Sequence, residues 1–448
     1  MTVRRYELYK NSDAQWLGDL PNHWETKRLR RLFEIKKRIV GTLGFDVLSV
    51  TQQGLKIKDT ESNDGQISLD YSKYQLVEPG DFAMNHMDLL TGYVDISQTR
   101  GVTSPDYRVF SIRNKKECYD RYYLYLLQTC YKSKIFYALG QGASQLGRWR
   151  LPTNQFQEFV FPQPPTQEQK QIADFLDNET AKIDTLVAEQ QRLVELLKEK
   201  RQAVISHTVT KGLNHNAPMK NSGVEWLEEV PRTWSIKALR RVISIPLSNG
   251  VFKKKDEFGV GVRLINVFDI YRHDFLVNLE TLDRVACSDA EIAAYQVVPG
   301  DLFFVRSSLK AEGIATVALA GPAQEAVVFE CHLVRARPNA DVLHPRYASY
   351  LLNSTHYRSM MIAKAKITTM TTVDQEAILS LPMLIPDLSE QSAIAAFLDN
   401  VTAKIDALIA EANASITLLQ ERRSVLIYAA VTGKIDVRQL GPVGVETA

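Results

Sequence analysis

The sequence lacks the features of a disulfide-bonded, zinc-binding or membrane-embedded protein. Its 448 residues include only four cysteines, which are scattered and form no Cys-x-x-Cys pair. This argues against a zinc site and against a disulfide framework. No run approaches the roughly 18 apolar residues of a membrane-spanning helix, and the N-terminus lacks the apolar core of a secretion signal. We therefore expect a cytoplasmic protein with reduced thiols.

A strong charge of one sign is also missing. The chain has 54 Lys and Arg against 52 Asp and Glu, which leaves a net charge of +2. Overall charge therefore does not indicate a nucleic-acid partner, and any basic binding surface must be local. With 45% hydrophobic residues, the chain can form two or three domains, each with its own core.

The usual catalytic motifs are missing as well. The Thr432-Gly433-Lys434 run lacks the upstream glycine and the final Ser or Thr of a phosphate-binding loop. No Asn-Pro-Pro-Tyr or Asp-Pro-Pro-Tyr run is present, with which adenine methyltransferases hold a flipped base. The histidines show neither metal-ligand spacing nor a pairing with Ser or Cys. We expect no catalytic residue, no metal and no cofactor in this chain.

What the sequence does contain is an internal repeat. Residues 168–210 recur at a constant offset of 222 as residues 390–432, and about half of the positions are identical. Other landmarks recur at changing offsets, such as Pro79-Gly80-Asp81 and Pro299-Gly300-Asp301. Changing offsets mean insertions and deletions between fixed landmarks, so we expect two similar lobes with different loops. A duplication by itself would imply nothing about function.

The repeated windows have the pattern of long amphipathic helices. Apolar residues recur at spacings of three and four, which is typical of a coiled-coil-like stripe. The predicted stripe consists of Ile183, Leu186, Leu193, Leu197 and Val204 in the first window and Ile405, Leu408, Ala412, Leu419 and Leu426 in the second, where Ile409 and Ile416 widen it. One such helix would ordinarily be a core or dimer contact. Two similar copies can pair in antiparallel fashion within the chain.

The ends of these helices also carry signals. Thr166 followed by Gln169 predicts a capping box at the first start, whereas Asp387 and Ser389 both remain candidates at the second. Gly212 and Gly433 are placed as C-caps. The Asp-Asn pairs at 177–178 and 399–400 are expected to divide each window into a short helix and a longer one.

Each lobe reads as a mixture of strands and helices. Strand-like runs occur at residues 46–50, 93–96 and 107–110 in the first lobe and at 262–267, 302–305 and 326–329 in the second; helical stretches occur at 121–132 and 345–363. The predicted class is α+β, with two mixed domains joined by two long antiparallel helical regions in pseudo-two-fold symmetry. The expected boundaries are 1–162 (first domain), 163–212 (central helical spacer), 213–385 (linker and second domain), 386–434 (C-terminal helical spacer) and 435–448 (tail).

Basic and polar residues gather in the loops of both lobes. Lys, Arg, Gln, Ser and Thr are side chains that contact phosphates or read base edges, although any single run is more often ordinary solvated surface. The candidate DNA contacts of the first lobe are Gln52, Gln53, Lys56, Lys58, Ser144, Gln145, Arg148 and Arg150. Those of the second lobe are Lys253, Lys254, Lys255, Arg263, Arg306, Ser307, Lys310, Lys366, Thr368 and Thr369.

The sequence resembles the specificity subunits of type I restriction-modification systems. The residues that carry the resemblance are Trp24 after Pro21, Pro164-Pro165 with Glu168-Gln169, the duplicated window and the closing Gly212. The resemblance covers nearly the whole chain. It implies that each lobe is a target-recognition domain for one half of a bipartite, asymmetric site in double-stranded DNA, and that the helices set the gap. It also implies two methyltransferase subunits docked on the chain and two restriction-translocase subunits in the full complex. S-adenosylmethionine, ATP and Mg would belong to these partners, and this chain would be non-catalytic.

Two other interpretations remain open from the residues alone. The chain could be a coiled-coil interaction scaffold that does not bind DNA, or a nuclease subunit with an unrecognised site. Steep loss of DNA affinity with rising salt would separate a DNA reader from a scaffold. Cleavage of DNA by the purified chain with magnesium would indicate the nuclease.

Overall fold

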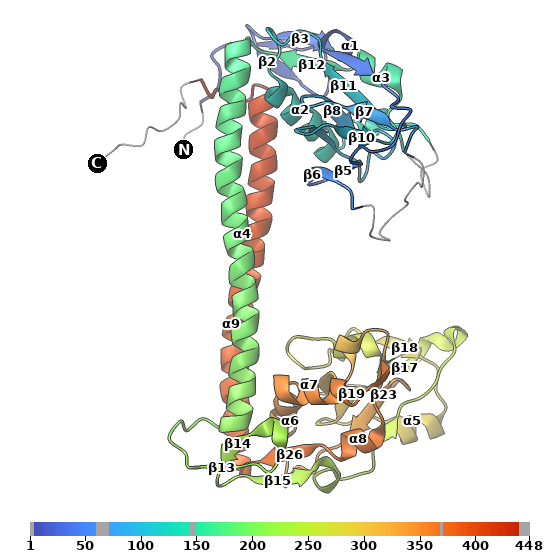
Figure 1. Ribbon diagram of the computed structural model, residues 1–448. Helices are drawn as coiled ribbons and strands as arrows, with labels where there is room; N and C mark the ends of the chain where they lie inside the picture. The colour runs from blue at the N-terminus through green and yellow to red at the C-terminus, as the bar shows by residue number, and fades with distance from the viewer. Residues whose placement is uncertain (1–3, 60–70, 143–148, 368–370, 439–448) are drawn as a thin grey trace. The chain divides into compact units, whose positions relative to one another are not determined.

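The computed structural model describes residues 4–59, 71–142, 149–367 and 371–438, and the chain divides into two compact units. Unit 1 comprises Met1–Gln190 with Ala414–Ala448, and unit 2 comprises Gln191–Asn413. Each unit contains one mixed lobe and a segment of both long helices, α4 (Thr166–Lys211) and α9 (Leu388–Val431) (Figure 1). Among the described residues, no helix is both long and apolar enough to cross a membrane.

The lobe of unit 1 has a four-stranded antiparallel sheet at its centre. The strand order is β4 (Phe33–Lys36), β11 (Arg108–Ile112), β8 (Phe82–Met84) and β9 (Val94–Ile96). Phe82 and Phe110 stack with ring centroids 5.2 Å apart, and helix α2 (Asp120–Lys132) lies against β9. Tyr123 of α2 packs edge-on against Phe33 of β4 with ring centroids 5.8 Å apart, which ties α2 to the sheet.

Shorter elements surround this sheet. Paired strands are β1 (Tyr9–Asn11) with β2 (Asp19–Pro21), β3 (Glu25–Arg28) with β12 (Val160–Gln163), β5 (Leu48–Thr51) with β6 (Gly54–Ile57), and β7 (Gln75–Val77) with β10 (Gly101–Thr103). The helical turns are α1 (Leu29–Leu32), η1 (Tyr137–Leu139) and α3 (Thr153–Glu158).

The lobe of unit 2 repeats this plan. Its four-stranded sheet has the order β16 (Ser248–Asn249), β23 (Leu333–Ala336), β19 (Leu302–Val305) and β21 (Val317–Leu319), and helix α6 (Pro345–Leu352) lies against β21. The pairs β13 (Met219–Asn221) with β14 (Glu229–Pro231) and β15 (Ser235–Ala238) with β26 (Pro382–Ile385) match β1–β2 and β3–β12 of unit 1.

The second lobe also has elements of its own. They are β17 (Phe258–Ile265) between β18 (Asp283–Val285) and β22 (Val327–Phe329), the set β20 (Ser307–Ser308), β25 (Thr371–Thr372) and β24 (Lys366–Ile367), and helices α5 (Asp289–Tyr295), α7 (Thr355–Ala363) and α8 (Gln375–Leu379). The short 3-10 turns are η2 (Glu225–Leu227), η3 (Leu239–Arg241), η4 (Lys255–Glu257), η5 (Val267–Ile270) and η6 (Ala311–Gly313).

The predicted strand runs all coincide with strands, namely β5, β9, β11, β17, β19 and β22, which confirms the mixed α and β content of both lobes. The helix predicted at 345–363 is broken into α6 and α7. The break lies at Asn353, whose side chain accepts from Val317 N at 3.1 Å and donates to Val317 O at 2.7 Å. This long-range pair ties the end of α6 to β21.

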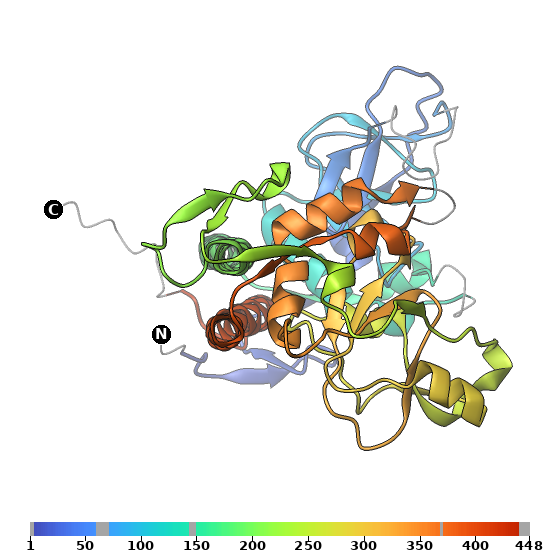
Figure 2. The same cartoon turned by 90° about the horizontal axis from the view of Figure 1, so that it is seen from below.

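The long helices are continuous, so the predicted breaks at 177–178 and 399–400 are wrong. Asp177 and Asp399 bond to side chains of the lobes and not to their own backbone, which would have favoured a turn. At a rise of 1.5 Å per residue, the 46 residues of α4 give a rod of about 69 Å. Figure 2 looks along the helices and shows α4 and α9 side by side at the unit 2 end.

Within each unit the two helix segments run antiparallel and face each other along a seven-residue repeat. In unit 1 the less exposed positions step through Ile183, Val187 and Gln190 on α4 and through Ile416, Leu419, Arg423 and Leu426 on α9. In unit 2 they are Val194, Leu197, Arg201 and Val204 on α4 and Ile405, Ile409 and Ala412 on α9.

Three of the predicted stripe residues lie outside this seam. Leu186, Leu193 and Leu408 have side chains 45%, 43% and 49% exposed. The predicted stripe took steps of three and seven from Ile183, whereas the helices keep alternating steps of four and three. A shift of one position turns a side chain by about 100° around the helix, away from the partner.

The helix caps differ from prediction at one end only. Gly212 and Gly433 end the two helices with φ of +80° and +70°, as expected of C-cap glycines. Asp387 Oδ1 accepts from Glu390 N at 2.8 Å and is the cap of α9. The capping box at Thr166 is wrong, because its hydroxyl donates to Lys116 O and the Gln169 amide donates to Glu117 O and Pro164 O.

Candidate nucleic-acid interface

The hairpin β5–β6 presents three of the candidate DNA contacts in unit 1. Gln52 and Gln53 are exposed at its turn, and the Lys56 ammonium donates to the Gln53 side chain. The Thr51 hydroxyl donates to Gly54 O at 2.8 Å, and Leu55 N donates to the Asp95 carboxylate on β9 at 2.9 Å. The turn is therefore held to the sheet while its glutamines point to solvent.

The other candidates of this lobe are spread more widely. Lys58 lines a separate cavity of about 410 Å³ together with Tyr74 and Tyr107. Arg150 is exposed, and its backbone pairs with that of Gln141. Ser144, Gln145 and Arg148 lie outside the described residues.

A half-buried histidine, His86, lies close to Arg150. Burial, followed by the charges of Arg108 and Arg150, lowers the pKa of His86 to about 3. This histidine is therefore neutral in the folded protein at any pH near 7. Within the described part of the chain, neither Arg108 nor Arg150 forms an ion pair with a carboxylate.

In unit 2, three of the candidates are already ion-paired. Lys253 lies between Glu257 and Glu291 at 3.2 and 2.8 Å, and its side chain is only 6% exposed. Arg263 pairs with Glu325 and Lys366 with Asp374, each at 2.7 Å. A phosphate would have to compete with these carboxylates.

The remaining candidates of unit 2 are less constrained. Lys254, Lys255, Arg306 and Lys310 have no ion-pair partner among the described residues. Ser307 is buried, its hydroxyl lies 2.5 Å from His332 Nδ1, and both line a cavity of about 670 Å³ with Lys310. Thr368 and Thr369 lie outside the described residues. All of these residues stay predicted contacts.

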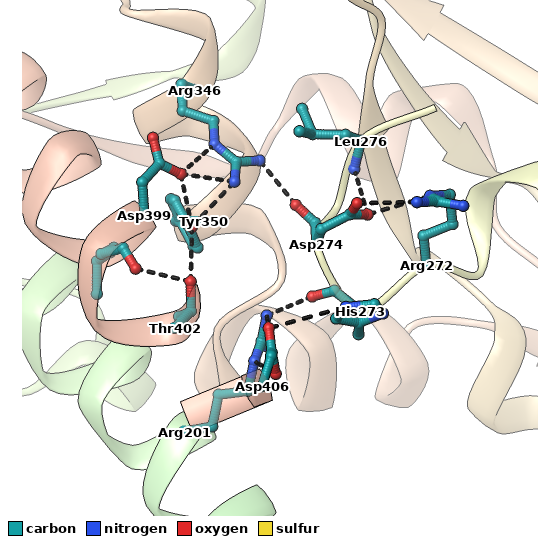
Figure 3. A network of polar contacts seen from close by, with 11 residues as sticks. Arg201, Arg272, His273, Asp274, Leu276, Arg346, Tyr350, Asp399, Thr402 and Asp406 are labelled. Atoms are coloured by element: carbon teal, nitrogen blue, oxygen red, sulfur yellow. Dashed lines mark hydrogen bonds and ion pairs between the residues drawn. The ribbon is translucent and has the colours of Figure 1, made fainter. Parts of the chain in front are cut away.

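Sequence reasoning missed the junction that holds each lobe on the helices. In unit 1, Asp177 of α4 accepts from Arg121 Nε at 2.9 Å and from the Tyr125 hydroxyl at 2.6 Å, both on α2. Unit 2 builds the same junction from Asp399, Arg346 and Tyr350, at 2.8 and 2.8 Å (Figure 3). The signal was present, since both the Arg-Tyr and the Asp-Asn pairs recur in the sequence.

Sequence reasoning also missed an ion pair that joins the two helices in each unit, here called the clasp. In unit 1, Arg423 Nε of α9 donates to Asp184 of α4 at 2.8 Å. In unit 2, Arg201 Nε of α4 donates to Asp406 of α9 at 2.9 Å. Each pair is the copy of the other at the offset of 222. The clasp therefore sets the register of the helix segments in both units.

The Pro-Trp landmarks lie against the closing glycines of the helices. A Cβ built on Gly433 would be 2.4 Å from Pro21 and 3.1 Å from Trp24, and one on Gly212 would be 3.3 Å from Trp234. The Trp234 indole also donates to Glu390 at 3.0 Å. These positions need glycine both for their positive φ and for the close approach of the ring.

No cluster of three or more His, Cys, Asp or Glu side chains suited to a metal ion occurs among the described residues. The geometry is that of a scaffold with exposed polar loops. Its repeated features are attachments of lobe to helix and of helix to helix.

Comparison with known proteins agrees with this construction. Two relatives are the type I restriction enzyme EcoKI specificity subunit of Escherichia coli K12 and the EcoBI specificity subunit of Escherichia coli. The first is 26% identical over 280 residues, 62% of this chain and 58% of the relative. The second is 24% identical over 344 residues, 74% of this chain and 69% of the relative. The chain thus spans little more than half of the EcoKI subunit.

Two solved structures share the fold. A chain from a structure of type I restriction-modification complex assembly aligns with a TM-score of 0.69 at 15% identity, covering 92% of this chain and 98% of that chain. The HsdS subunit from Thermoanaerobacter tengcongensis aligns with a TM-score of 0.53 at 15% identity, covering 93% and 98%. The family model of the type I restriction modification DNA specificity domain matches residues 21–196 and 297–418. Because the matched residues make up more than half of the chain, the chain belongs to that family, as the sequence resemblance predicted.

Proposed function

We propose that this chain is the non-catalytic DNA-recognition subunit of a cytoplasmic type I restriction-modification complex. Each lobe reads one half of a bipartite, asymmetric site in double-stranded DNA. The observation that carries the proposal is that one scaffold is built twice around different loops. The attachments to the helices are the same in both units, whereas other elements of the two lobes differ.

This division of labour follows from how proteins read DNA. Contacts to phosphates fix position, and contacts to base edges supply sequence preference. The Arg121–Asp177 and Arg346–Asp399 junctions hold both lobes in the same way. Among the described residues of unit 2, no two-stranded hairpin matches β5–β6, and the longer β17 pairs there with β18 and β22. Two lobes held alike with unlike loops suit two different half-sites.

The helices suit the role of a spacer. Both α4 and α9 are continuous and pass from one unit into the other. The length of α4, about 69 Å, compares with about 34 Å for one turn of duplex DNA. We propose that the length of these helices sets the number of base pairs between the two half-sites.

The exposed faces of the helices support docking of partner subunits. Apolar side chains outside the seam remain 43 to 66% exposed, and such surfaces usually mark interaction sites. They are Leu186, Leu418 and Val425 in unit 1 and Leu193, Leu196 and Leu408 in unit 2. We propose that two methyltransferase subunits bind here and that two restriction-translocase subunits complete the enzyme. S-adenosylmethionine, ATP and Mg would act in those partners.

Sequencing the methylome of the host with and without this chain tests the proposal. We expect one bipartite adenine-methylated motif to disappear when the chain is removed. Salt-titrated binding of the reconstituted complex to that motif should show steep loss of affinity. A complex that binds no DNA would indicate the scaffold, and cutting by the purified chain with magnesium alone would indicate the nuclease.

A further inference from the structure

Unit 2 fills the space beside its lobe-helix junction with its own chain. The His273 and Asp274 carbonyls accept hydrogen bonds from Arg201 and Arg346, the latter at 2.8 Å. The Arg201 guanidinium also lies over the Phe275 ring, 5.3 Å from its centroid. The junction arginine, Arg346, and the clasp arginine, Arg201, therefore each bond both to a carboxylate and to a backbone carbonyl.

In unit 1 the same place is an open groove of about 1200 Å³. Four of its lining residues are Arg121, Tyr125, Asp177 and Thr180, which correspond to the junction residues of unit 2. The clasp pair Asp184 and Arg423 lines it as well. Among the described residues, no segment of unit 1 takes the place of the backbone that fills unit 2.

Each of the two arginines that line the groove has one nitrogen without a hydrogen-bond partner among the described residues. Arg121 bonds to Asp177 through Nε and Nη2, and Arg423 bonds to Asp184 through the same two nitrogens. The Nη1 group of each has no hydrogen-bond partner in the part of the chain that the structure describes. In unit 2 it is Nη1 of Arg346 that reaches the Asp274 carbonyl.

The groove also has more positive than negative charge. Lys132 and Lys134, at the end of α2, line it and have no carboxylate partner among the described residues. Desolvation of the ammonium by the groove walls, followed by the nearby charge of Arg423, lowers the pKa of Lys132, and Asp184 opposes this shift. Asp95 also lines the groove, but the backbone N–H groups of Leu55 and Ile96 already satisfy its carboxylate. The position corresponding to Lys132 in unit 2, eleven residues after the junction arginine, is the buried Tyr357.

We propose that this groove of unit 1 binds the phosphate backbone of duplex DNA. The contacts would be made by Lys132, Lys134 and the unpaired Nη1 groups of Arg121 and Arg423. The inference rests on the proposed function and adds a phosphate site on the helix side of one lobe. An anion is favoured over a peptide segment because uncharged carbonyls would leave the two lysines without a counter-charge. Gln52 and Gln53, at the rim of the same groove, would then lie beside the bound strand. In unit 2 the Asp274 carbonyl occupies Nη1 of Arg346, the His273 carbonyl and the Phe275 ring cover Arg201, and Tyr357 replaces the lysine, so we expect no phosphate contact there.

The test is the salt dependence of DNA binding by the complete methyltransferase complex with the double variant Lys132→Gln and Lys134→Gln. Each lost phosphate contact lowers the slope of log affinity against log salt by about 0.9, so we expect a decrease of about 1.8. Between 50 and 200 mM salt the variant would lose about 12-fold less affinity than the wild type. Cognate and unrelated duplexes should be affected alike, because phosphate contacts carry no sequence preference.

Lys115→Gln with Lys116→Gln is the matched control, since these exposed lysines of the same unit do not line the groove. The inference is overturned if both double variants change the slope equally or not at all. It is also overturned if the groove variant keeps the wild-type slope but binds the methyltransferase subunits less tightly, which would make the groove a protein-binding site. A wild-type complex that binds no DNA would refute the proposed function itself, an outcome visible before any variant is compared.

Discussion

The two helix clasps offer a comparison within one molecule, because the same ion pair is made in two settings. Arg201 and Asp406 in unit 2 have side chains 10% and 21% exposed, and the arginine also bonds to the His273 carbonyl. Arg423 and Asp184 in unit 1 are 25% and 57% exposed. Replacing Asp406 by Asn leaves a mostly buried guanidinium without its carboxylate, which costs about 3 kcal/mol. Replacing Asp184 by Asn breaks a pair open to water and costs at most about 1 kcal/mol.

Hydrogen exchange of the amides in α4 and α9 measures this difference locally, since the two units need not unfold together. We expect Asp406→Asn to speed exchange in residues 194–211 and 388–412 by about 100-fold, and Asp184→Asn to speed exchange in unit 1 by less than about 6-fold. A double-mutant cycle of Asp406→Asn with Arg201→Met should show coupling of about 2 kcal/mol. Equal losses in the two units, or a larger loss from Asp184→Asn, would refute the reasoning from burial.

Three further predictions concern other parts of the molecule. In urea unfolding, Gly433→Ala should destabilise unit 1 by about 2 kcal/mol more than Gly41→Ala. Both glycines have a positive φ, but only Gly433 is packed against Pro21. Equal losses of stability from the two variants would contradict this. The depressed pKa of His86, about 3, means that the unfolded chain binds a proton below pH 6.5 that the folded chain does not. Stability should therefore fall by up to about 1.4 kcal/mol per pH unit as the pH drops from 6 to 4, and His86→Gln should flatten this dependence of the urea midpoint. Inserting seven residues into both α4 and α9 preserves the seam and should lengthen the gap in the methylated motif, whereas inserting four should abolish methylation; an unchanged gap after the seven-residue insertion would count against the spacer.

Much of the fold could be predicted because its signals are local or repeated. The glycine C-caps, the strand runs and the helical windows each depend on residues close in sequence, and the duplication doubled the evidence for every landmark. The continuity of α4 through Asp177 could not be predicted, since it depends on Arg121 and Tyr125 of the lobe. Part of the predicted stripe was misplaced for a similar reason. The sequence alone does not distinguish leucines that face solvent from leucines that face the partner helix.

The candidate site was harder to predict, because the availability of a charge depends on distant partners. Lys253 and Arg263 look like surface cations in the sequence, yet Glu291 and Glu325 neutralise them in the folded lobe. Conversely, Lys132 belongs to an ordinary amphipathic helix in the sequence. Only the fold brings it to the same groove as Arg423, almost three hundred residues later.

Exchange of one lobe tests the central claim most directly. Residues 23–161 would be replaced by the corresponding residues of a relative with a different motif, and the methylome of the host would then be sequenced. We predict that one half of the bipartite motif changes to that of the donor, while the other half and the gap stay the same. A motif that changes in both halves, or in neither, would contradict two independent readers on a common spacer.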